Sequence, residues 1–172
     1  MIIDIGIMKI IVGGSMINSS HEMLYFAYGL NTNLEAMQAR CPAAQNLGAA
    51  VLPGYQLAFS HYCDIRPHAD QQVHGVLWDI TPNCLISLDQ LEGYPEYYNR
   101  HWDYIVQDST GKKLRAMAYF MQTSPAISPP SQYYLDSVTD GYKQHRLPCD
   151  QLWDALKQSR KAMLARVNGR LT

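Results

Sequence analysis

The order of predicted strands and helices is the feature that most limits how this chain can fold. Short apolar runs typical of strands occupy residues 23–27, 51–60, 73–80, 102–106 and 114–121. The polar stretch 61–72 joins two of them, either as a loop or as a long hairpin. Helix signals fall between these runs without a regular strand–helix–strand rhythm. This pattern predicts one α+β domain over residues 23–172.

A short helix is predicted directly after the first strand. Thr32 is the expected N-cap, because Glu35 three residues later would complete a capping box. Leu34, Met37 and Cys41 should share one face of this helix, which should end before Pro42.

The next helix has both a start and a stop signal. Thr81 is a suitable N-cap, and Pro82 suits the first helical position. Gly93 is expected to end the helix in a left-handed conformation. The buried stripe of this helix should consist of Leu85, Leu88 and Leu91.

Two more helices are predicted in the last third of the chain. The first follows a cap at Ser128-Pro129-Pro130, and its side chains at a spacing of four are Tyr134, Val138 and Tyr142. The second begins at about Asp150, and its inward-facing side chains should be Leu152, Leu156, Met163 and Val167.

Composition excludes several classes of protein. Of the 172 residues, 47% are hydrophobic and 17% charged, which is typical of a soluble globular protein rather than a disordered one. The net charge of −1 disfavours nucleic acid as a partner. The four cysteines are widely spaced without a CxxC pair, which favours a reducing, cytoplasmic location and indicates neither zinc nor disulfides.

Residues 1–22 form an apolar N-terminal extension that stands outside the functional prediction. The segment lacks the basic start and cleavage site of a signal peptide, and Gly13-Gly14-Ser15 interrupts it too early for a membrane span. No membrane association is therefore expected. A start of the natural chain near Met23, a short extra strand and a disordered tail all remain open.

Tyr28, Gly29, Leu30 and Asn31 form a turn between the first strand and the first helix. Backbone N–H groups at a helix start have no helical partners, and the helix dipole adds positive charge there. Such a turn can bind a carboxylate or another small anion. Most turns of this kind are only turns, so the pattern alone is weak evidence.

Glu92 is a candidate general base. It is predicted at the last helical position, where the dipole disfavours an anion, beside Leu91, Tyr94, Tyr97 and Tyr98. Both the dipole and partial desolvation should raise the pKa of its carboxyl group. A solvated glutamate at a helix end is the plainer interpretation of the same pattern.

Several ordered motifs together resemble the γ-glutamylcyclotransferase superfamily, including its AIG2-like members. The resemblance extends from Met23 to about Pro148. The motifs are Tyr28-Gly29-Leu30-Asn31, Arg40-Cys41-Pro42, Gly54-Tyr55-Gln56-Leu57-Ala58-Phe59, Val73-His74-Gly75-Val76-Leu77-Trp78 and Leu88-Asp89-Gln90-Leu91-Glu92-Gly93.

The resemblance implies a small, mixed, mostly antiparallel sheet that curls into a barrel with flanking helices. It implies release of 5-oxoproline from a γ-glutamyl compound, without metal or organic cofactor, by a monomer or homodimer. Glu92 would be the catalytic acid/base, and Tyr28, Gly29, Leu30 and Asn31 the loop that holds the glutamyl half. Tyr98 and Tyr134 would contact substrate, although Tyr97 competes with Tyr98. The family loop usually carries Ser where this chain has Leu30.

Three other interpretations stay open. A cysteine hydrolase would pair Cys63 or Cys84 with His61 or His74, and a metal site would use His61, His68 and His74, but neither set matches a known motif. The third is a non-catalytic domain on the same fold that binds a small ligand or a protein. The basic C-terminal tail could also contact a polyanion; its charges are Lys157, Arg160, Lys161, Arg166 and Arg170.

Overall fold

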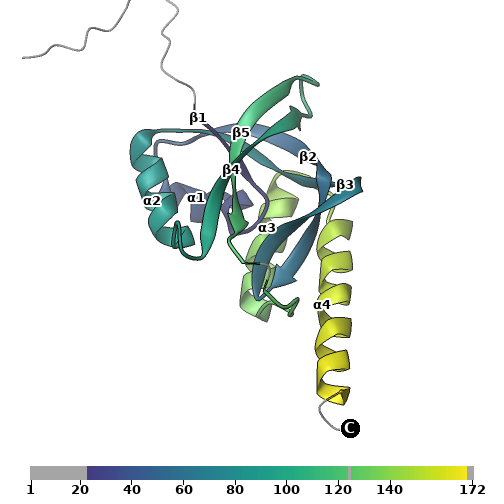
Figure 1. Cartoon of the computed structure of the whole chain (residues 1–172). Helices are drawn as coiled ribbons and strands as arrows, with labels where there is room; N and C mark the ends of the chain where they lie inside the picture. The colour runs from purple at the N-terminus through teal and green to yellow at the C-terminus, as the bar shows by residue number, and fades with distance from the viewer. Residues whose placement is uncertain (1–22, 124, 170–172) are drawn as a thin grey trace, which may run out of the picture.

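Five strands close into a barrel in the computed structural model, which describes residues 23–123 and 125–169 (Figure 1). Around the barrel the strands are β1 (Met23–Ala27), β3 (Tyr62–Ile80), β2 (Gln45–Ser60), β4 (Tyr98–Gln107) and β5 (Lys113–Met121). All neighbours are antiparallel except β1 and β5, which close the barrel in parallel. The predicted α+β class and the curled, mostly antiparallel sheet are confirmed. The expectations for residues 1–22 lie outside the described residues.

The hairpin of β2 and β3 is the longest pairing in the barrel. Residues 62–72 are not a loop: they belong to β3, and their pairing with β2 begins at Ser60 and Tyr62. His61 makes the tight turn between the strands with a positive φ of 67°. The hairpin alternative is therefore confirmed.

The helices are α1 (Leu34–Arg40), α2 (Pro82–Glu92), α3 (Gln132–Gln144) and α4 (Asp150–Asn168), and a single 3₁₀ turn (Leu30–Thr32) lies between β1 and α1. Figure 1 shows α2 on one side of the barrel and α4 on the opposite side, where α4 continues beyond the sheet toward the C-terminus. In the described part of the chain no helix has the length and apolar character needed to cross a bilayer.

Two of the predicted N-caps are wrong. Thr32 belongs to the 3₁₀ turn, where its hydroxyl donates to the Gly29 carbonyl at 2.8 Å, so α1 begins one residue later with Asn33 as its N-cap. Ser131, not Ser128, caps α3 by accepting from the Tyr134 N–H at 3.2 Å. Thr81 is confirmed as the cap of α2.

Some predicted helix faces are also wrong. Met37, Leu88, Val138 and Leu152 are fully buried as expected. By contrast, four side chains expected to face the core are 40–50% exposed: Leu34 40%, Leu91 48%, Met163 41% and Val167 50%. For Met163 and Val167 the reason is the position of α4, whose last turns extend past the barrel, so the sheet does not cover these side chains.

Close packing of α3 fixes the turn that follows β1. A Cβ atom at Gly141 would lie 2.4 Å from Thr32 Oγ1 and 2.6 Å from the Asn33 nitrogen, so only glycine allows this approach. The neighbouring Tyr142 is fully buried, and its hydroxyl donates to the Tyr28 carbonyl at 2.9 Å. The two contacts hold the 3₁₀ turn against the barrel.

Candidate active site

A cavity of about 600 Å³ gathers all seven residues predicted to form a site. Its wall combines the end of β1, the 3₁₀ turn, the β2–β3 turn, the end of α2, the start of β4, the end of β5 and α3. The predicted residues that line it are Tyr28, Gly29, Leu30, Asn31, Glu92, Tyr98 and Tyr134. Segments far apart in the sequence thus meet around one space large enough for a small metabolite.

The turn after β1 presents backbone donors at this cavity. Leu30 and Asn31 are the first two residues of the 3₁₀ turn, so their N–H groups have no acceptor within it. The hydrogen bonds of the turn run instead from the Thr32 and Asn33 N–H groups to the carbonyls of Gly29 and Leu30. This arrangement can accept a carboxylate or an oxyanion from the cavity.

Glu92 is the last residue of α2, and Gly93 ends the helix with a φ of 61° as predicted. Burial raises the pKa of the Glu92 carboxyl group from its usual 4.5 to about 7, and the Arg40 charge and a hydrogen bond from Asn31 offset part of that rise. The predicted direction is confirmed, with desolvation as the cause. A carboxyl group with this pKa can take and return a proton near neutral pH.

Asn31 connects Glu92 to the rest of the site. It is buried, and its Nδ2 donates to Glu92 Oε1 at 3.2 Å and to the Tyr25 hydroxyl at 2.9 Å. Its Oδ1 accepts from Arg40 Nη1. With both ends of the amide engaged, the orientation of Asn31 is fixed.

Tyrosine side chains build the wall by bonding to backbone atoms. The Tyr98 hydroxyl donates to the Cys63 carbonyl at 2.9 Å, and the Tyr134 hydroxyl accepts from the Cys63 N–H at 3.1 Å. Tyr28 donates to the Tyr119 carbonyl. Tyr98 is half-buried whereas Tyr97 is 76% exposed, yet both line the cavity, so their parts in substrate contact stay predictions.

The last turn of α2 is tied to the sheet on the side of Glu92. Asp89 accepts from the Tyr119 hydroxyl at 2.7 Å and forms an ion pair with Arg100. These contacts hold the helix end, and with it Glu92, against β4 and β5. Arg100 also lies over the ring of Tyr94, 4.4 Å from its centroid.

The cavity is also lined by residues that were not among the predicted site residues, and Tyr25, Arg40 and Tyr119 are three of them. Arg40 had a usable signal, since it stands in the Arg40-Cys41-Pro42 motif that carried part of the resemblance. Tyr25 and Tyr119 look like ordinary strand residues in the sequence. Only the closure of the barrel brings their rings together, 5.9 Å apart.

The cysteine and metal interpretations find little support. Cys63 and His61 both line the cavity, but burial raises the pKa of the Cys63 thiol to about 12, which keeps it protonated and a poor nucleophile. Within residues 23–123 and 125–169, no three His, Cys, Asp or Glu side chains are grouped as metal ligands.

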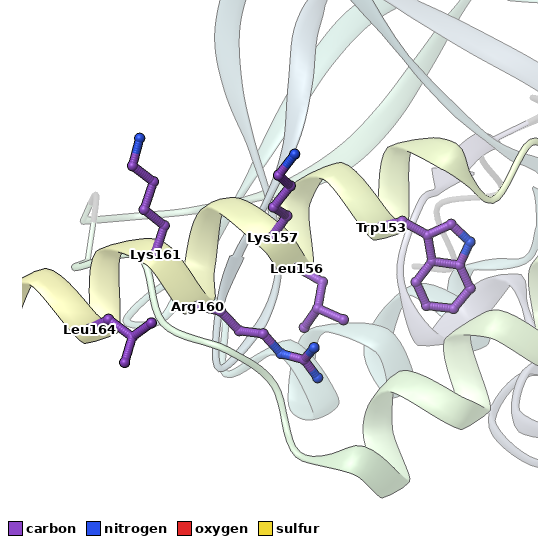
Figure 2. Close-up of a pocket in the computed structure, with 6 residues that line it drawn as sticks. All are labelled: Trp153, Leu156, Lys157, Arg160, Lys161 and Leu164. Atoms are coloured by element: carbon purple, nitrogen blue, oxygen red, sulfur yellow. The ribbon is translucent and has the colours of Figure 1, made fainter.

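A second, open depression lies along α4 (Figure 2). In this view Trp153, Leu156, Arg160 and Leu164 point to one side of the helix, while Lys157 and Lys161 point to the other. These six residues include cations and apolar groups but no carboxylate, and all come from one helix. The depression therefore lacks a carboxyl group such as Glu92 in the first cavity.

Comparison with known proteins identifies the family of the chain. The sequence pattern of the family described as "Gamma-glutamyl cyclotransferase, AIG2-like" matches residues 25–142. The chain is 28% identical over 141 residues to gamma-glutamylcyclotransferase of Bos taurus, covering 75% of this chain and 74% of that protein. It is 29% identical over 141 residues to gamma-glutamylcyclotransferase of Homo sapiens, with the same coverage.

A solved structure titled "Gamma-glutamyl cyclotransferase" is similar in fold as well as in sequence. The TM-score is 0.68 at 26% identity, over 83% of this chain and 87% of that one.

Proposed function

Because the chain belongs to the gamma-glutamyl cyclotransferase, AIG2-like family, we propose that it cyclises a γ-glutamyl compound and releases 5-oxoproline, with Glu92 as the general acid/base. One observation carries this proposal. Burial raises the pKa of the Glu92 carboxyl group to about 7, and this group accepts a hydrogen bond from Asn31, which belongs to the turn that offers backbone donors. A proton acceptor and an anion-binding turn in one cavity are what the cyclisation needs.

The reaction is an intramolecular acyl transfer in which nothing is oxidised or reduced. The α-amine attacks the side-chain carbonyl carbon, a C–N bond forms to close the five-membered lactam, and the original amide C–N bond breaks. On the way to the lactam the α-ammonium nitrogen loses two protons. Glu92 takes the first, which frees the amine for attack, and returns it to the leaving nitrogen; the second passes from the tetrahedral intermediate to the departing amine, which leaves as an ammonium ion. Holding the glutamyl part of the substrate in a curled conformation lowers the activation barrier by about 7–11 kcal/mol through proximity and orientation.

The 3₁₀ turn supplies the electrostatic part of the mechanism. The N–H groups of Leu30 and Asn31 are available to the oxyanion or to the substrate carboxylate. A backbone donor is independent of its side chain, so Leu30 can replace the usual serine of the family loop. Tyr98 and Tyr134 are expected to contact the substrate from the wall.

The proposed substrates are γ-glutamyl amino acids, peptides or amines. A screen of such compounds, including glutathione, for 5-oxoproline release would identify the leaving half. Cys41, Cys63, Cys84 and Cys149 are free thiols, which supports a reducing compartment such as the cytoplasm. If the folded protein released no 5-oxoproline from any of these γ-glutamyl compounds, a domain that binds a small carboxylate would become the better hypothesis.

Substitution of Glu92 tests the mechanism. Glu92→Gln keeps the shape but cannot accept the ammonium proton, so cyclisation should fall by about 10²–10⁴-fold. Glu92→Asp should be almost as inactive, because the carboxylate retracts by about one methylene and leaves hydrogen-bond distance. Glu35→Gln is the matched control, since Glu35 is exposed on α1, outside the cavity. Parental activity of either Glu92 variant would refute the acid/base role.

A further inference from the structure

The charges around the cavity are unevenly distributed. Arg40 is the only Arg or Lys among the described residues that line it, while Glu92 and Glu96 contribute carboxyl groups. Arg40 is half-buried at the last position of α1, and in the described part of the chain no carboxylate forms an ion pair with it. Its charge acts on Glu92, lowering the pKa of that carboxyl group, but no carboxylate lies within ion-pair distance of it among the described residues. A partly desolvated cation without a direct ion pair favours binding of an anion from the cavity.

The contacts of Arg40 leave most of its donors available. A guanidinium carries five N–H donors in a fork that matches a carboxylate. Among the described residues its hydrogen bond is to the Oδ1 of Asn31, through Nη1. The remaining donors can therefore bind a group in the cavity without breaking this contact.

Asn31 sets the spacing between Arg40 and Glu92. Arg40 contacts the oxygen of the Asn31 amide, and Glu92 contacts the nitrogen of the same amide. A positive and a negative side chain thus lie one amide group apart. The α-carboxylate and the α-ammonium group of an amino acid are attached to one carbon atom, so they can meet both charges at once.

We propose that Arg40 binds the α-carboxylate of the glutamyl half while Glu92 receives the α-ammonium group, so that the charged end of the substrate lies across Asn31. This inference rests on the proposed function and narrows its substrate class. Only compounds whose glutamyl α-carboxyl group is free should be processed. A glutamyl residue whose α-carboxyl group is in a peptide bond should be rejected, because Arg40 would face an uncharged amide.

A merely positioning role for Arg40 has a different signature. If Arg40 only held Asn31, its loss would slow every substrate by the same factor. If Arg40 binds the carboxylate, its loss should slow only substrates that carry one. The comparison therefore needs two substrates that differ at the α-carboxyl group alone.

The experiment uses γ-glutamyl-para-nitroanilide and its α-carboxamide analogue with the full-length parent protein, Arg40→Gln and Arg40→Lys. Release of para-nitroaniline gives kcat and KM, and circular dichroism checks folding. Arg115→Gln is the control for loss of a cation, because Arg115 is exposed and lies outside the cavity. Calorimetric titration with 5-oxoproline and its carboxamide measures carboxylate binding independently of turnover.

The parent protein should favour the carboxylate substrate by about 10- to 150-fold in kcat/KM, the factor expected for a hydrogen bond to a charged group. At about pH 9, where Glu92 should be ionised in both proteins, Arg40→Gln should lose that preference, mainly through a higher KM, while its kcat/KM for the carboxamide stays within about threefold of the parent. Arg40→Lys should keep part of the preference, because it retains the charge without the planar fork. Binding of 5-oxoproline should weaken in parallel.

Two results would overturn the inference: a parent protein that does not distinguish the substrates, or an Arg40→Gln variant that slows both equally. If the parent released nothing from either substrate, the cyclisation proposal would fail on its own. The carboxylate site would then be decided by calorimetry. Binding of 5-oxoproline by the parent and its loss in Arg40→Gln would support the site, and no binding by the parent would refute it.

Discussion

Glu92→Gln should make the protein more stable, and only at neutral to alkaline pH. Burial raises the pKa of this carboxyl group from 4.5 to about 7, so keeping the ionised form in the folded state costs free energy. Glutamine fills nearly the same volume and carries no charge at any pH. The substitution should therefore remove a penalty that the functional carboxylate imposes on the fold.

The size and sign follow from the two pKa values. Between pH 4.5 and about 7 the folded state binds more protons at Glu92 than the unfolded state does, so stability falls as the pH rises through this window and is constant above it. At about 1.4 kcal/mol per tenfold change in the ionisation constant, the rise of the pKa from 4.5 to about 7 corresponds to a total loss of somewhat more than about 3 kcal/mol. The advantage of Glu92→Gln should be below about 1 kcal/mol near pH 5 and about 3 kcal/mol near pH 8.5.

Urea unfolding of the parent and Glu92→Gln at these two pH values measures the difference. Taking the difference between the proteins at each pH cancels the titration of all other groups. Glu35→Gln serves as the control and should change the free energy of unfolding by less than about 1 kcal/mol at either pH. An equal effect of Glu92→Gln at both pH values would refute the assignment of a buried carboxyl group with a raised pKa.

Two further predictions concern activity. The kcat/KM of the parent should fall about tenfold per pH unit below pH about 7, because Glu92 must be ionised to accept a proton. In Arg40→Gln this acidic part of the pH–rate profile should move to higher pH, because the guanidinium charge of Arg40 lowers the pKa of Glu92. A pH-independent rate between about pH 5 and 8 would contradict this. Leu30→Ser should change kcat/KM by less than about tenfold if the turn acts through backbone N–H groups. A larger gain measured by 5-oxoproline release would show that the hydroxyl matters.

Local sequence signals determined much of the scaffold. The five apolar runs became the five strands, and Thr81, Pro82 and Gly93 set the ends of α2 as predicted. Helix start and stop signals depend on neighbours within one helical turn, so they can be recognised in the sequence without knowledge of the fold. The same locality explains the errors at Thr32 and Ser128, where the chain makes an extra turn before the helix begins and a nearby polar residue takes over the cap.

Tertiary structure decided which polar groups share one space and which apolar groups stay in solvent. Asn31 and Glu92 are 61 positions apart, and they meet because β1 pairs with β3, the strand that leads into α2. The raised pKa of Glu92 depends on that burial, which no window of sequence contains. Arg40 is likewise held in position by its hydrogen bond to Asn31. Met163 is exposed because α4 extends beyond the sheet. Sequence thus specified most of the elements and singled out Glu92 as a candidate, whereas long-range packing supplied the desolvation that raises the pKa of Glu92 and the Arg40 charge that opposes this rise.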